Sequence, residues 1–125
     1  MKQIRVAVIG LGWWGRIIAG LLQGNRKLAV ACAVDVDPAS GDFASGLNIP
    51  FQVNFDSVLS DPAVEAVILC TPHSQHCDQI VRAAGAKKHV FCEKPLSLTR
   101  ADAARAIAAC KANGVALGVG HERRF

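Results

Sequence analysis

Three glycines near the N-terminus constrain this chain more than any other feature of its sequence. Gly10, Gly12 and Gly15 follow the apolar run Ile4 to Ile9 and precede residues 13–22, where apolar side chains recur at helical spacing. The string G-x-G-x-x-G is unspecific by itself, but a strand before it and a helix after it are the setting in which it binds a dinucleotide. The alternative is a glycine turn that only packs. The sequence therefore predicts a βαβ unit with an anion site at the start of its helix.

Each glycine has a distinct physical task in such a loop. Gly10 permits a tight turn, Gly12 lets a pyrophosphate approach the backbone, and Gly15 lets the helix pack closely on the strand. Trp13 and Trp14 fill the two positions between the second and third glycines, so both tryptophans of the chain lie in the expected binding loop. A phosphate-binding P-loop is excluded because no Gly-Lys-Ser/Thr follows.

Asp35 lies twenty residues after Gly15, at the end of the apolar run Leu28 to Val34. An acid at this place accepts hydrogen bonds from the adenosine ribose hydroxyls. It also repels a 2′-phosphate, at roughly 4 kcal/mol per charge pair for ~4 Å and an effective dielectric of ~20. We therefore expect NAD(H) to be preferred over NADP(H). The alternative is that Asp35 caps the next helix, although Asp37 is the better cap because Pro38 suits the first helical position.

The rest of the chain alternates short apolar runs with helical patterns. Continuous apolar strands between helices are typical of a parallel sheet covered on both faces. Six strand candidates fit a single domain, residues 1–125, with a doubly wound, mostly parallel α/β Rossmann sheet of order 3-2-1-4-5-6. Beyond the first two strands, the expected strands are 51–53, 66–70, 88–92 and 115–119, and the expected helices are 38–46, 56–59, 74–86 (with Ser74 as cap) and 99–113.

Composition excludes several classes of protein. Apolar residues make up 51% of the chain and charged residues 19%, which rules out intrinsic disorder. Apolar runs never reach the ~20 residues of a membrane helix. The net charge of +4 is scattered, without the basic stripe of a nucleic-acid binder. We expect neither membrane nor nucleic-acid partners. The odd cysteine count and the lack of CxxC predict reduced thiols in the cytoplasm, at Cys32, Cys70, Cys77, Cys92 and Cys110.

Only one short segment of the sequence groups candidate metal ligands. His73 and His76 are three residues apart at an expected helix start, beside Cys77 and Asp78. A structural zinc needs four ligands in a compact set, and Cys77 points elsewhere on the helix. We therefore expect no metal.

Three polar clusters follow the later strands, at the sheet edge where open α/β folds bind ligands. They are residues 71–76 (TPHSQH), 92–95 (CEKP) and 118–125 (GVGHERRF). With the glycine loop and Asp35, they resemble the glucose–fructose oxidoreductase and inositol dehydrogenase family, called Gfo/Idh/MocA. The resemblance spans the whole chain in order. Its most specific parts are Glu93-Lys94-Pro95 and the ending Arg-Arg-Phe.

The resemblance implies a nicotinamide-dependent oxidoreductase that transfers hydride to or from a sugar, polyol or inositol-like substrate. It makes Lys94 the catalytic residue, hydrogen-bonded to the reacting hydroxyl; from the residues alone, a solvated loop lysine is the alternative. It assigns no role to His73, His121 or Glu122, which depart from the family's usual residues. Together with the loop, the implied cofactor-binding residues are Gly10, Gly12, Trp13, Trp14, Gly15, Asp35, Thr71, Pro72, His76, Glu93, Lys94 and Arg124.

The resemblance also implies a second α/β domain after residue 125 that carries most substrate contacts. This chain holds only the dinucleotide-binding half, so we expect it to bind NAD and to be catalytically incomplete. Association into homo-oligomers is expected through the second domain. The alternative function is a non-catalytic dinucleotide-binding module, such as a redox sensor or a regulatory partner.

Overall fold

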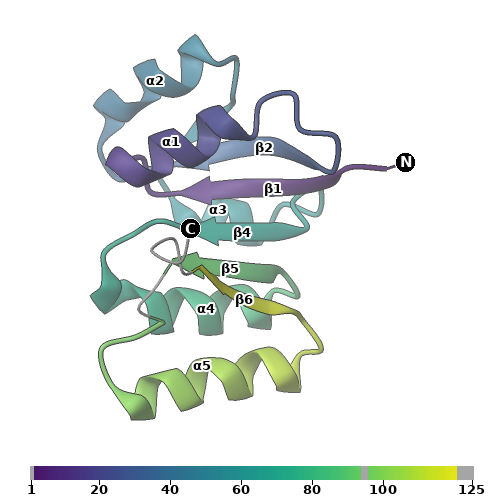
Figure 1. Ribbon diagram of the computed structural model, residues 1–125, viewed down its shortest axis with the longest axis vertical. Coiled ribbons are helices and arrows are strands. Elements are labelled where there is room, and N and C mark those ends of the chain that lie inside the picture. Colours follow the sequence, from purple (N-terminus) through teal and green to yellow (C-terminus); the bar gives the residue numbers. More distant parts are fainter. Residues whose placement is uncertain (1, 94–95, 121–125) are drawn as a thin grey trace.

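Six parallel strands form one sheet in the order β3-β2-β1-β4-β5-β6 (Figure 1). The computed structural model describes residues 2–93 and 96–120. The predicted fold class and strand order are both confirmed. The strands are β1 (Ile4–Ile9), β2 (Leu28–Val34), β3 (Phe51–Gln52), β4 (Ala66–Leu69), β5 (His89–Glu93) and β6 (Leu117–Gly120).

The helices connect consecutive strands, as the sequence predicts, with two corrections. Residues 38–46 divide into a 3-10 turn and a short α-helix, with Asp37 as the cap: its carboxylate accepts from Ala39 N. Ser74 does not cap a helix but lies inside a second 3-10 turn, because the chain turns sharply after Pro72 before the helix begins at His76. The helices are α1 (Trp13–Leu21), η1 (Pro38–Ser40), α2 (Gly41–Gly46), α3 (Phe55–Leu59), η2 (His73–Gln75), α4 (His76–Gly85) and α5 (Arg100–Ala112).

Helices cover both faces of the sheet, and each face has its own apolar cluster. Successive side chains of β1 point to opposite faces: Val8 packs with α1 and α2, whereas Ala7 and Ile9 pack with α3, α4 and α5. Figure 1 shows α1 and α2 on the side of β1 and β2, and α4 and α5 on the side of β4, β5 and β6. None of the described helices combines the length and the hydropathy needed to cross a lipid bilayer.

The chain reverses its direction of winding between β3 and β4. It moves outward from β1 to β3 and then returns, so β4 pairs with β1 on the other side. All six strands run in the same direction, because every neighbouring pair is parallel, and their carboxyl ends therefore lie at one edge of the sheet. The loops after β1 and β4 diverge there, which leaves a crevice at the reversal point.

Lys88 is a buried cation outside this crevice. It lies just before β5, where the sequence predicts the strand to begin, and its side chain is 6% exposed. Its ammonium donates to the carbonyl oxygens of Asp61 and Val64, each at 2.7 Å. These bonds hold the loop between α3 and β4 against the start of β5.

Candidate functional site

The glycine loop between β1 and α1 packs so closely that two of its glycines leave no space for a side chain. Gly10 has a φ of +97°, which side chains rarely adopt, and a Cβ there would lie 2.7 Å from the Cys70 carbonyl oxygen. A Cβ on Gly15 would lie 1.8 Å from the Gly10 carbonyl oxygen. These two glycines therefore have the packing roles that the sequence predicts for them.

Gly12 differs from its two neighbours in the motif. It is the N-cap residue of α1, and a Cβ built there meets nothing within 4 Å. The first N–H groups of any helix lack partners inside the helix, and Gly12 has no side chain with which to cap them. The head of α1 is thus open and carries the positive end of the helix dipole, as an anion site requires.

Asp35 binds the glycine loop directly. One carboxylate oxygen, Oδ2, accepts from the backbone N–H of Leu11 at 2.7 Å, and Oδ1 accepts from the N–H of Asp37 at 2.9 Å. Asp37 caps the 3-10 turn, so the capping alternative for Asp35 is wrong. The half-buried Asp35 carboxylate is fixed at the end of β2, next to the open head of α1.

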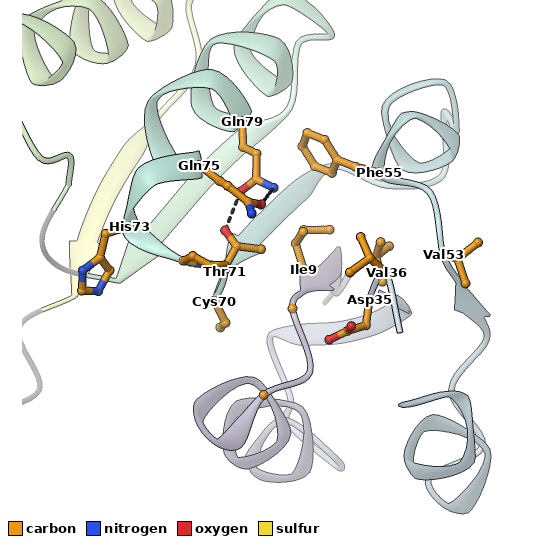
Figure 2. Close-up of a pocket in the computed structure, with 14 residues that line it drawn as sticks. Ile9, Asp35, Val36, Val53, Phe55, Cys70, Thr71, His73, Gln75 and Gln79 are labelled. Atoms are coloured by element: carbon orange, nitrogen blue, oxygen red, sulfur yellow. Dashed lines mark hydrogen bonds between the residues drawn. The ribbon is translucent and has the colours of Figure 1, made fainter. Parts of the chain in front are cut away.

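A cavity of about 710 Å³ fills the crevice between these segments. Figure 2 shows Ile9, Asp35 and Val36 facing Thr71 across it, with the side chains of Val53 and Phe55 completing the apolar side. The opposite wall is polar and comes from the loop after β4 and from α4. The lining residues are Ile9, Gly10, Gly12, Val34, Asp35, Val36, Val53, Phe55, Cys70, Thr71, Pro72, His73, Gln75 and Gln79.

Two glutamines make the polar wall. The Thr71 hydroxyl donates to Gln79 Oε1 at 2.5 Å, and Gln79 Nε2 donates to Gln75 Oε1 at 3.3 Å (Figure 2). Neither glutamine is among the site residues predicted from the sequence. Their spacing of four residues on one face of the predicted helix, directly after Thr71, is the signal that could have found them.

His76 lies behind this wall and does not line the cavity. The side chain is fully buried; Nε2 is 2.9 Å from the Thr71 carbonyl oxygen and Nδ1 is 3.1 Å from Cys92 Sγ. A carbonyl oxygen only accepts, so Nε2 donates to it. Burial, with Cys70 and Glu93 nearby, raises the pKa of Cys92 to about 12, so its thiol stays protonated. His76 thereby ties the Thr71 loop to β5.

His73 is exposed at the rim of the cavity, with its ring 5.5 Å from that of His76. In residues 2–93 and 96–120, no three His, Cys, Asp or Glu side chains come together in a way that could hold a metal ion.

Trp14 and Glu93 meet across the sheet edge. The indole N–H of Trp14, at the start of α1, donates to Oε1 of Glu93, the last residue of β5. Trp13 is exposed, and its ring centroid is 5.8 Å from that of Trp14. The structure thus brings together both ends of the predicted site. The residues Lys94, Pro95, His121, Glu122 and Arg124, named among the sequence motifs, lie outside the described part of the chain.

The chain matches a known protein family and several curated relatives. A family model described as an oxidoreductase family with an NAD-binding Rossmann fold, Gfo/Idh/MocA, matches residues 4–121. Myo-inositol 2-dehydrogenase of Thermotoga maritima is 47% identical over 124 residues, which are 98% of this chain and 37% of the relative. The chain spans about a third of the length of the curated relatives that it matches, 33% to 37% for two of them.

Solved structures also resemble this chain over nearly its whole length, which is again about a third of their own. The scyllo-inositol dehydrogenase of Lactobacillus casei, solved with NAD(H) and scyllo-inositol, has a TM-score of 0.89 and 29% identity, over 99% of this chain and 38% of that one. An oxidoreductase of Desulfitobacterium hafniense described as NADPH-dependent has a TM-score of 0.92 and 28% identity, over 99% and 36%. Similar folds are therefore associated with both nicotinamide cofactors.

Proposed function

The chain belongs to the Gfo/Idh/MocA oxidoreductase family as its NAD-binding Rossmann domain, and from this membership we propose a cofactor preference and a reaction. The domain binds NAD(H) in preference to NADP(H). It serves an oxidoreductase that moves hydride between the nicotinamide and a sugar, polyol or inositol-like substrate. The inositol dehydrogenases among its relatives support this substrate class.

The residues at the crevice fit a dinucleotide. The observation that carries the proposal is the open face of Gly12 at the head of α1, beside the fixed carboxylate of Asp35. A diphosphate can reach the backbone at Gly12, and the ribose next to it then lies within reach of Asp35. The cavity of about 710 Å³ continues between the apolar side chains of Val36 and Val53 and the polar wall at Thr71, which suits a flat base.

The preference for NAD(H) rests on charge around Asp35. Its carboxylate repels a 2′-phosphate, and the next residue, Val36, is 87% exposed and offers no cation to replace that repulsion with attraction. Enzymes that bind NADP commonly place an arginine near this position. The binding residues of this proposal are those named from the sequence except His76, which is buried behind the Thr71 loop and supports it, with Gln75 and Gln79 added from the cavity wall.

The chain's own residues bind and orient the reactants, whereas the nicotinamide, when bound, supplies or accepts the hydride. We assign to Lys94 the proton at the substrate hydroxyl, because an ammonium next to a cationic ring holds its proton less tightly and can relay it near neutral pH. We place most substrate contacts in a second domain, since the relatives are about three times as long as this chain. Homo-oligomers would form through that domain.

We also propose a cytoplasmic location. All five cysteines are free, and four of them are buried. Reducing compartments keep such thiols unpaired.

Calorimetric titration with NAD⁺ and NADP⁺ tests the proposal. We expect wild-type protein to bind NAD⁺ at least tenfold more tightly, about 1.4 kcal/mol, and Asp35→Ala to reduce this difference. Asp37→Ala is the matched control, because it removes a neighbouring carboxylate that caps a turn and should leave the preference as it is. Equal affinity of the wild-type protein for both cofactors would overturn the preference, and no binding of either would overturn the function.

A further inference from the structure

The hydrogen bond between Trp14 and Glu93 joins two elements on opposite sides of the crevice. Trp14 belongs to the glycine loop and Glu93 ends β5, 79 positions further along the chain. Neither residue lines the cavity that holds Asp35. The bond therefore fixes a carboxylate beyond the proposed adenosine site, at the carboxyl ends of the second half of the sheet.

Backbone packing holds the same carboxylate from the other side. A Cβ on Gly120, in β6, would lie 2.7 Å from Glu93 Oε2. The carboxylate is thus confined between the Trp14 indole and the backbone of β6. Only glycine at residue 120 leaves it this space.

The second carboxylate oxygen of Glu93 lacks a hydrogen-bond donor among the described residues. Oε2 is buried, and no donor among residues 2–93 and 96–120 reaches it. A buried acceptor without a donor destabilises the folded state, and more so when it is charged. Such an atom suits a donor that arrives with a ligand.

The place of Glu93 indicates which part of a ligand supplies that donor. Dinucleotides lie across the reversal point of such a sheet, with the two nucleotide halves over its two strand sets. Asp35 follows β2 and marks the adenosine half, whereas Glu93 ends β5 and marks the other half. The donors on that half are the ribose hydroxyls and the carboxamide N–H groups of the nicotinamide riboside.

We propose that Trp14 is a positioning residue, which holds Glu93 so that Oε2 accepts a hydrogen bond from the nicotinamide riboside half of the cofactor. This inference rests on the proposed function. It gives Trp14, the residue before the third glycine of the motif, a task separate from diphosphate binding. Loss of the indole N–H should then weaken binding of the nicotinamide riboside half and leave binding of the adenosine half unchanged.

Calorimetric titration with NAD⁺ and with ADP separates the two halves, because ADP lacks the nicotinamide riboside. For Trp14→Phe we expect NAD⁺ affinity to fall about tenfold, the loss typical of a hydrogen bond to a charged group, while ADP affinity stays unchanged. Leu21→Ala, a control at an exposed position at the end of α1 and outside the cavity, should keep both wild-type affinities. In a Glu93→Ala background, Trp14→Phe should cause no further loss.

A second variant approaches the same carboxylate without touching the glycine loop. Gly120→Ala displaces Glu93 from the β6 side and should also lower NAD⁺ affinity selectively. Circular dichroism and thermal unfolding check that each variant is folded, and Gly120→Ala alone decides the question if Trp14→Phe does not fold.

The outcomes distinguish the inference from the function on which it rests. Equal losses for NAD⁺ and ADP in Trp14→Phe would show a structural role in the loop and overturn the inference. Unchanged NAD⁺ affinity in both variants would overturn it as well, with cofactor binding intact. If the wild-type protein binds NAD⁺ no more tightly than ADP, the inference alone is refuted. If it binds neither ligand, the proposed function is refuted.

Discussion

Alanine at Gly12 and at Gly15 should separate the folding role of the glycine loop from its binding role. The two positions are three residues apart in one motif. An added methyl at Gly15 would lie 1.8 Å from the Gly10 carbonyl oxygen, but at Gly12 it would meet nothing within 4 Å. Gly15→Ala therefore disturbs the folded chain, whereas Gly12→Ala only places a methyl in front of the binding surface.

The sizes of the two effects follow from these contacts. Overpacking costs about 1–3 kcal/mol, and the backbone clash at Gly15 places Gly15→Ala at the upper end. At roughly 4 °C per kcal/mol for a domain of this size, the melting temperature falls by about 12 °C. At Gly12, the φ of −74° suits alanine, and a weaker N-cap is offset by reduced entropy of the unfolded chain, so the change stays within about 1 kcal/mol.

Thermal unfolding and NAD⁺ titration of both variants check this reasoning. Gly12→Ala should unfold like wild type but bind NAD⁺ at least about tenfold more weakly, because the methyl keeps the diphosphate from the backbone amides. Gly15→Ala should lose stability first. Wild-type affinity in Gly12→Ala, or a wild-type melting temperature in Gly15→Ala, would refute the assignment of roles.

Three further predictions concern stability, thiols and emission. Lys88→Met should lower the free energy of unfolding by about 2–4 kcal/mol in urea titrations, because two buried carbonyls lose their donor; unchanged stability would contradict this. Burial raises the pKa of Cys70 and Cys92 to about 12, so their protonated thiols stabilise the fold fully below pH 9 and this contribution is lost as pH rises towards 12. Iodoacetamide at pH 9 should then label unfolded protein much faster than native protein, and equal rates would disprove the protection. Because the chain has two tryptophans and no tyrosine, NADH should quench emission and NADPH should quench it less; a flat NADH titration would argue against binding.

Strand order and element positions were predictable because they depend on local patterns. Short apolar runs mark the strands, and Thr99, the first residue of the expected helix 99–113, caps α5 by accepting from Asp102 N. Errors are confined to element ends, where a turn competes with a helix: residues 73–75 form a 3-10 turn because Pro72 precedes them.

Contacts between distant residues were not predictable in the same way. The pairing of Trp14 with Glu93 and the burial of Lys88 depend on how strands align in the sheet, and no local pattern encodes them. Gln79 is similar: its partner Thr71 is close in sequence, but only the folded crevice shows that both face a cavity.

The pairing of β1 with β4 also affects how the domain opens. Ile9 and Leu69 are register partners although 60 positions separate them (69 − 9), the largest separation of any strand pair in the sheet. Closing a flexible loop of that length costs roughly 3–4 kcal/mol of chain entropy. The ladder therefore forms only when the two halves of the sheet come together, and a molecule bound between the loops after β1 and β4 holds them in this arrangement. Amide hydrogen exchange along β1 and β4 should slow more on ligand binding than exchange in α5.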